Sequence, residues 1–89
     1  MFSKYARVAD STVIERVRVR DRYCQICGRP TQDVHHITSR GSGGPDSVEN
    51  CIGLCREHHN MAHTGEIPRS ELRGVLVEKY GFEYPKEDL

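Results

Sequence analysis

Two short motifs with the same spacing constrain this 89-residue chain more than any other feature. Cys24 and Cys27 flank two residues, and Cys55 and His58 repeat that spacing further along the chain. A CxxC turn lets two thiolates face one centre, and a second pair one helical turn apart completes a tetrahedron. Four soft or borderline ligands in a tetrahedron are what a structural zinc ion requires. The pattern therefore predicts a zinc knuckle formed by these four residues.

A zinc ion would also compensate for a small core. Only 36% of the residues are hydrophobic and Trp is absent, and chains of this size often need a metal or disulfides for stability. Two alternatives stay open: a Cys24–Cys27 disulfide or free thiols, and Cys51 in place of His58 as the fourth ligand. Cys51 is otherwise a small buried hydrophobe. The N-terminus lacks a signal-peptide core, so we expect an intracellular protein with no membrane partner, where cysteines more often bind metal.

The periodicity predicts a helix over about 12–22, in which Arg16 and Arg20 lie away from the apolar face. The same stretch, RVRVR, also alternates like a strand. Further along the chain we expect the strand VHHIT, the loop SRGSGGPDS, the strand VENCIGL, the helix CREHHNMAHTG and a last helix over about 68–80. These elements predict one α+β domain over residues 1–89, in which the metal-type motifs lie within about 12–66.

Four further histidines lie within 29 residues, namely His35, His36, His59 and His63. Residues four apart share one face of a helix, so His59 and His63 can share a metal ion. Neighbours in a strand point to opposite sides, so His35 and His36 cannot easily bind the same ion. One of the pair can therefore be a ligand while the other is available as a base.

The stretch from CQIC to NMAH resembles the HNH endonucleases, which have a ββα-metal fold, often with a zinc knuckle. The family's strand His, second-strand Asn and helix His correspond to His36, Asn50 and His59. Many members have Asp where this chain has His35. A subset that includes certain colicin nuclease domains uses His there, together with a helix His placed like His63.

The resemblance implies a metal-dependent DNA endonuclease of low or short sequence specificity, with His36 as the general base. It implies that His35, His59 and His63 hold one divalent ion, which could be Mn²⁺, Ni²⁺, Zn²⁺ or Mg²⁺. Three imidazoles favour the transition metals over Mg²⁺. Asn50 would tie the loop to the first strand and fix the aim of the base. Arg40, in the loop after the base, is the best candidate for a phosphate contact.

The distribution of charge is compatible with a DNA partner. Residues 1–40 carry eight basic and four acidic residues, whereas the remainder carries five and nine. An ordinary solvated surface explains the same numbers. Further contacts to the DNA backbone could come from Arg16, Arg18, Arg20 and Arg22.

Two other readings stay open. One is a non-catalytic, zinc-stabilised module that binds nucleic acid or protein, and the other is a disulfide-stabilised secreted nuclease. A nuclease without a recognition domain suggests a bacterial or phage-encoded protein, and a homodimer is the simple route to a double-strand cut.

Overall fold

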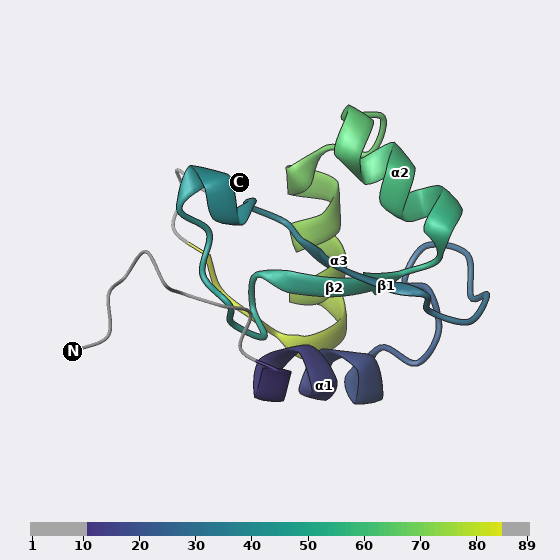
Figure 1. Cartoon of the computed structure of the whole chain (residues 1–89), viewed down its shortest axis with the longest axis horizontal. Coiled ribbons are helices and arrows are strands. Elements are labelled where there is room, and N and C mark those ends of the chain that lie inside the picture. Colours follow the sequence, from purple (N-terminus) through teal and green to yellow (C-terminus); the bar gives the residue numbers. More distant parts are fainter. Residues whose placement is uncertain (1–10, 85–89) are drawn as a thin grey trace.

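The computed structural model describes residues 11–84 and confirms the predicted small α+β fold. Its elements, in chain order, are α1 (Ser11–Arg20), β1 (Asp33–His36), the 3₁₀ turn η2 (Arg40–Ser42), β2 (Cys51–Leu54), α2 (Arg56–Thr64) and α3 (Arg69–Tyr80). The hairpin of β1 and β2 lies at the centre, with α1 on one side, α2 on the other and α3 behind it (Figure 1). The expectations for residues 1–10, and for the tail beyond residue 84, lie outside the described residues.

The two strands pair antiparallel, with His35 opposite Ile52 and His36 opposite Cys51. All four residues of β2 are buried, because helices cover this strand on both sides, whereas β1 is only partly covered. Among the described residues β1 has a strand neighbour along one edge only. Its two histidines are nevertheless mostly covered, since His35 is buried and the side chain of His36 is 13% exposed.

Gly53, in the middle of β2, allows α1 to end directly against the sheet. A Cβ atom at this position would lie 2.7 Å from the Cβ of Asp21, which is too close. The Gly53 N–H instead donates a hydrogen bond of 2.9 Å to the Asp21 carboxylate. The missing side chain thus lets a buried carboxylate join α1 to the hairpin.

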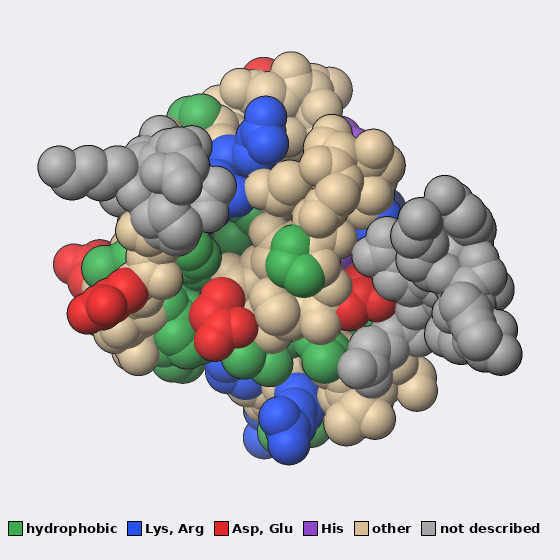
Figure 2. All heavy atoms as spheres, turned by 90° about the vertical axis from the view of Figure 1, so that its left-hand side faces the viewer, with side chains coloured by type: hydrophobic (Ala, Val, Ile, Leu, Met, Phe, Trp, Pro, Cys, Tyr) green, Lys and Arg blue, Asp and Glu red, His purple; other side chains and the backbone are tan. Residues whose placement is uncertain are grey.

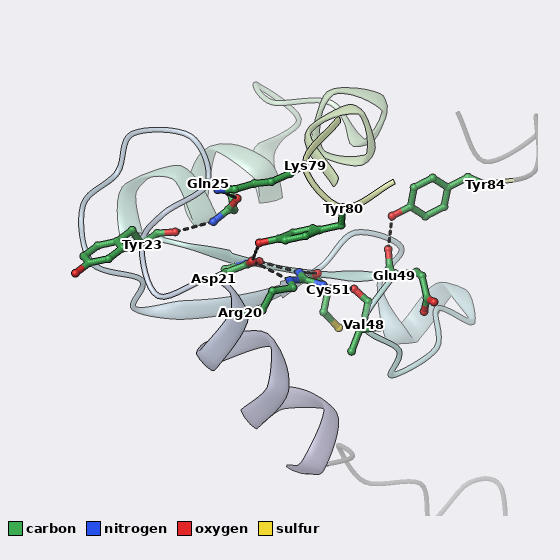
Figure 3. Close-up of polar contacts among 11 residues, drawn as sticks. Arg20, Asp21, Tyr23, Gln25, Val48, Glu49, Cys51, Lys79, Tyr80 and Tyr84 are labelled. Atoms are coloured by element: carbon green, nitrogen blue, oxygen red, sulfur yellow. Dashed lines mark hydrogen bonds and ion pairs between the residues drawn. The ribbon is translucent and has the colours of Figure 1, made fainter. Parts of the chain in front are cut away.

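Asp21 is fully buried and also joins α1 to α3 (Figure 3). The Arg20 guanidinium donates to both of its carboxylate oxygens, at 2.8 and 2.7 Å, and the Tyr80 hydroxyl donates to Oδ1 at 2.7 Å. Burial opposes ionisation of Asp21, but these bonds and the one from Gly53 outweigh it and lower the pKa of the carboxyl. An ionised carboxylate therefore holds three elements together.

These contacts correct the expectation for Arg20. We predicted that it lies away from the apolar face, where it could contact DNA. Its guanidinium instead binds Asp21 and two backbone carbonyls, those of Val48 and Cys51, and lies over the Tyr80 ring. The mean period of a helix cannot reveal this, because the partners come from distant parts of the chain.

The apolar core lies between the hairpin and α3. Its members are Cys24, Ile37, Ile52, Leu54, Cys55, Ile67, Leu72 and Leu76. Leu72 and Leu76 are one turn apart on α3 and fully buried, as the apolar period predicts. Tyr84, after the end of α3, donates a hydrogen bond of 2.6 Å to the Glu49 carbonyl.

The surface in Figure 2 shows Lys and Arg side chains interspersed with Asp and Glu side chains. The charge difference between the two parts of the sequence therefore gives no uniformly basic field on this face. Within the described ranges, no helix combines the length and apolar character needed to cross a membrane.

Candidate functional site

The first candidate centre brings together Cys24, Cys27, Cys55 and His58. Cys24 and Cys27 come from the turn after α1, while Cys55 caps α2 and His58 lies in its first turn. The Cys27 and Cys55 sulfurs are 3.8 Å apart, and Nδ1 of His58 lies 3.3 and 3.7 Å from the sulfurs of Cys55 and Cys24. A tetrahedron with metal–sulfur bonds of about 2.3 Å has edges of roughly 3.8 Å. The donor set and its size therefore fit a closed zinc site.

Cys51, the rival fourth ligand, lies outside this cluster. It is fully buried on β2, where burial raises the pKa of its thiol to about 11. All four cysteines are free, so no Cys24–Cys27 disulfide is present. In the cluster, a hydrogen bond from the Arg29 guanidinium, of 3.2 Å, lowers the pKa of the Cys27 thiol to about 6. A thiolate is the form that binds metal.

The second candidate centre joins His35 of β1 to His59 and His63 of α2. Their ring centroids are 4.8 to 5.4 Å apart, and one donor nitrogen from each lies within 4.8 Å of the others. Burial and the neighbouring histidines lower the pKa of His35 to about 4, so its ring is neutral near pH 7. His63 is exposed, so this cluster has an open side. Three nitrogen donors with an open side suit a catalytic ion rather than a structural one.

Asp33 supports this cluster, and our reading of the sequence missed it. Its Oδ2 lies 3.1 Å from Nδ1 of His59, and it also accepts a hydrogen bond of 2.9 Å from Arg56. Arg56 and His59 outweigh partial burial and lower the pKa of the Asp33 carboxyl. An ionised carboxylate only accepts, so Nδ1 of His59 donates and Nε2 keeps its lone pair for a metal. The sequence did contain a signal for Asp33. It lies two residues before His35, and residues two apart in a strand point to the same face of the sheet.

His36 contacts the loop rather than the three-histidine cluster. Its Nε2 lies 2.6 Å from Oδ1 of Asp46, and both side chains are largely buried. Arg40 Nε lies 3.2 Å from the same oxygen. Asp46 was not predicted as a site residue, because nothing in a Gly- and Ser-rich loop indicates which residue turns inward.

Asn50 ties the loop to the end of β1. Its amide nitrogen donates to the carbonyls of Thr38 and Pro45, both at 2.9 Å, and its Oδ1 accepts from the Thr38 N–H at 2.9 Å. Gly44 lets the loop approach, since a Cβ there would overlap the Thr38 carbonyl. The buried amide thus uses both its donor and its acceptor to fix the loop beside His36.

One pocket of about 670 Å³ is lined by the three-histidine cluster, Asp33, His36 and Arg40, whereas Asp46, Asn50 and the zinc-type cluster do not line it. Both His35 and His36 line it, although neighbours in a strand point to opposite faces. Three arginines from separate elements also line it: Arg18 of α1, Arg40 of η2 and Arg69 of α3. Arg69 was not predicted, since a single Arg at a helix start carries no distinguishing pattern.

Comparison with known proteins relates this chain to one protein family and to two curated proteins. The family model described as HNH endonuclease matches residues 24–65. Among curated proteins of Escherichia coli (strain K12), the chain is similar to the Type IV methyl-directed restriction enzyme EcoKMcrA, at 42% identity over 50 residues, or 56% of this chain. It is also similar to the uncharacterized protein YdfU, at 33% identity over 63 residues, or 67% of this chain. Each alignment covers only 18% of the relative's length.

Proposed function

Because the chain belongs to the HNH endonuclease family, we propose that it is a metal-dependent endonuclease that hydrolyses phosphodiester bonds of DNA. The observation that carries the proposal is the pocket, where a three-histidine cluster with an open side lies beside a fourth histidine outside that cluster. A module that only bound DNA or protein would need the zinc knuckle but no such arrangement. EcoKMcrA, whose name describes a restriction enzyme, supports a DNA substrate.

His36 is the general base of this proposal. It takes a proton from water as the water oxygen bonds to phosphorus and the bond from phosphorus to the 3′ oxygen breaks. The departing oxygen is protonated from solvent. A histidine suits this role, because an imidazole nitrogen that has a free lone pair can accept a proton from water.

His35, His59 and His63 would hold one divalent ion. Such an ion supplies positive charge against the negative charge that develops on the phosphate and the leaving oxygen. Nitrogen ligands favour Mn²⁺, Ni²⁺ or Zn²⁺ over Mg²⁺. The protein's part is to keep the His35 ring neutral, which its burial does, and to orient the His59 ring, which the Asp33 contact does.

The three pocket arginines hold the DNA. Arg18, Arg40 and Arg69 come from three directions around the pocket, and a guanidinium donates in a planar fork that matches phosphate oxygens. Contacts of this kind position the backbone without reading bases, in keeping with low or short sequence specificity. The separate Cys₃His cluster has no open position and serves as the structural zinc site.

A single-turnover assay on a labelled DNA duplex tests this function. The zinc-loaded protein, freed of other metals, receives Mg²⁺, Mn²⁺, Ni²⁺ or Zn²⁺ singly, and His36→Ala is compared with wild type. The expected result is metal-dependent cleavage that falls by about 10²-fold or more in the variant, the usual contribution of a general base. Glu78→Gln, an exposed change on α3, is the matched control and should cleave like wild type. Equal cleavage by His36→Ala would remove His36 from the mechanism.

A further inference from the structure

We propose that Asp46 is a positioning residue that orients the imidazole of His36, an inference that rests on the function proposed above. The two residues are ten positions apart, yet Nε2 of His36 and Oδ1 of Asp46 are 2.6 Å apart. The exposed fractions of the side chains are only 13% and 7%. A contact this short and this sheltered from water holds a ring far better than one on the surface.

The chemistry of the pair determines which nitrogen acts. An ionised carboxylate offers acceptors only, so Nε2 of His36 must carry a hydrogen and donate it. The lone pair then remains on Nδ1, which becomes the atom that accepts the proton from water. Asp46 thereby selects one tautomer and one ring orientation, as the buried partner of a catalytic histidine does in general.

The position of Asp46 is itself fixed by backbone contacts. Asn50 donates to the carbonyl of Pro45, the residue immediately before Asp46, and also to the carbonyl of Thr38 just after β1. The connection therefore runs from Asn50 through the loop to Asp46, and from Asp46 to His36. This makes aiming the base a joint task of Asn50 and Asp46.

Arg40 connects the same carboxylate to the proposed DNA site. Its Nε lies 3.2 Å from Oδ1 of Asp46, the oxygen that also receives Nε2 of His36. Because one oxygen serves both donors, an amide oxygen at the same place can replace it. Asp46→Asn should therefore keep the orientation of the ring, whereas Asp46→Ala should lose it.

Kinetics and binding together test the proposal. Single-turnover cleavage and DNA affinity are measured for wild type, Asp46→Asn, Asp46→Ala and Glu49→Ala, which removes an exposed acidic side chain from the same loop. We expect Asp46→Ala to lose about 10²-fold in rate, the cost of roughly 1 Å of misplacement, with DNA affinity within about twofold. Asp46→Asn should stay within about tenfold of wild type, and Glu49→Ala should be unchanged. An Asp46→Ala rate like that of Glu49→Ala, or Asp46→Asn as slow as Asp46→Ala, would overturn the positioning role.

A measurement that does not need activity separates this proposal from the proposed function. Long-range ¹H–¹⁵N NMR of the zinc-loaded protein reports which imidazole nitrogen carries the hydrogen. We expect the Nε2–H tautomer of His36 in wild type and in Asp46→Asn, and a mixture of tautomers in Asp46→Ala. An Nδ1–H tautomer in wild type would overturn the inference. A wild type that has the Nε2–H tautomer but cleaves no DNA would overturn the function instead.

Discussion

The Asp33 carboxylate lies 3.1 Å from Nδ1 of His59, although the two residues are 26 positions apart. This contact leaves Nε2 of His59 with its lone pair, beside His35 and His63. A residue that hydrogen-bonds to the second ring nitrogen of a metal-binding histidine commonly raises metal affinity by 10- to 100-fold. The strand that carries His35 of the cluster therefore also carries the residue that contacts His59.

We predict that Asp33→Ala weakens Mn²⁺ or Ni²⁺ binding to the three-histidine cluster by about 10- to 100-fold. The knuckle zinc should stay in place, since Asp33 does not contact that cluster. Isothermal titration of the zinc-loaded protein measures the affinity for Mn²⁺ or Ni²⁺, and elemental analysis measures the zinc content. Glu71→Gln, an exposed change on α3, serves as the control. Unchanged affinity in Asp33→Ala would show that the contact does not orient a ligand.

Two of the three buried cysteines, Cys51 and Cys55, should respond differently to substitution. Cys55→Ser removes one of the four residues proposed to bind zinc, and we expect loss of zinc and of cooperative unfolding, because metal binding supplies folding free energy in small domains. Cys51→Ala should keep one tightly bound zinc per chain and lose only a modest amount of stability. Elemental analysis and thermal melting measure both. Loss of the zinc in Cys51→Ala would instead make Cys51 the fourth ligand.

The buried Asp21 should give the protein an acid-sensitive component of stability. Its pKa is lowered in the folded state, so its contribution is complete above the ordinary value of about 3.9 and is lost as pH falls through the lower, folded pKa. We expect Asp21→Asn to lower the free energy of unfolding by about 3 kcal/mol at neutral pH, as for one partner of a buried pair. The difference from wild type should shrink below about pH 4. Denaturant titrations at several pH values measure this difference in the free energy of unfolding. A difference that does not change with pH would show that ionised Asp21 does not stabilise the fold.

The pocket arginines should appear in the salt dependence of DNA binding. In a His36→Ala background, which prevents cleavage, each of Arg18→Ala, Arg40→Ala and Arg69→Ala should reduce the slope of log affinity against log salt by about one. Arg22→Ala is the matched control, since Arg22 is exposed but does not line the pocket. Fluorescence anisotropy over a range of salt gives the slopes. If Arg22→Ala had the same effect as the others, the pocket would not be the DNA site.

The elements and the zinc-type cluster were accessible from the sequence through periodicity and spacing, whereas the full three-histidine cluster was implied by the resemblance to the HNH endonucleases. The Cys24–Cys27 and Cys55–His58 pairs could be recognised by their equal intervals, and α3 by its apolar period. The contacts of Asp46 and Arg20 could not be read in the same way. Each depends on a partner brought close by tertiary packing, for which local patterns leave no signal.

Arg20 shows the limit most clearly. On a helical wheel Arg20 lies on the exposed face of α1. In the structure its side chain instead binds the buried Asp21 and two carbonyls, that of Val48 before β2 and that of Cys51 in β2. Asp33 is the intermediate case: its strand face was predictable, but its contact with α2 was not. The extent of the domain, residues 1–89, stays a prediction.

Plasmid cleavage by the zinc-loaded wild-type chain tests the central claim most directly. Supercoiled DNA is incubated with this zinc-loaded protein, freed of other metals, first alone and then with Mg²⁺, Mn²⁺, Ni²⁺ or Zn²⁺ added singly. We expect no cleavage without an added ion, and nicking or linearisation with a transition metal that exceeds the cleavage seen with Mg²⁺. Intact plasmid with every metal, from a folded protein that holds its knuckle zinc, would contradict the account.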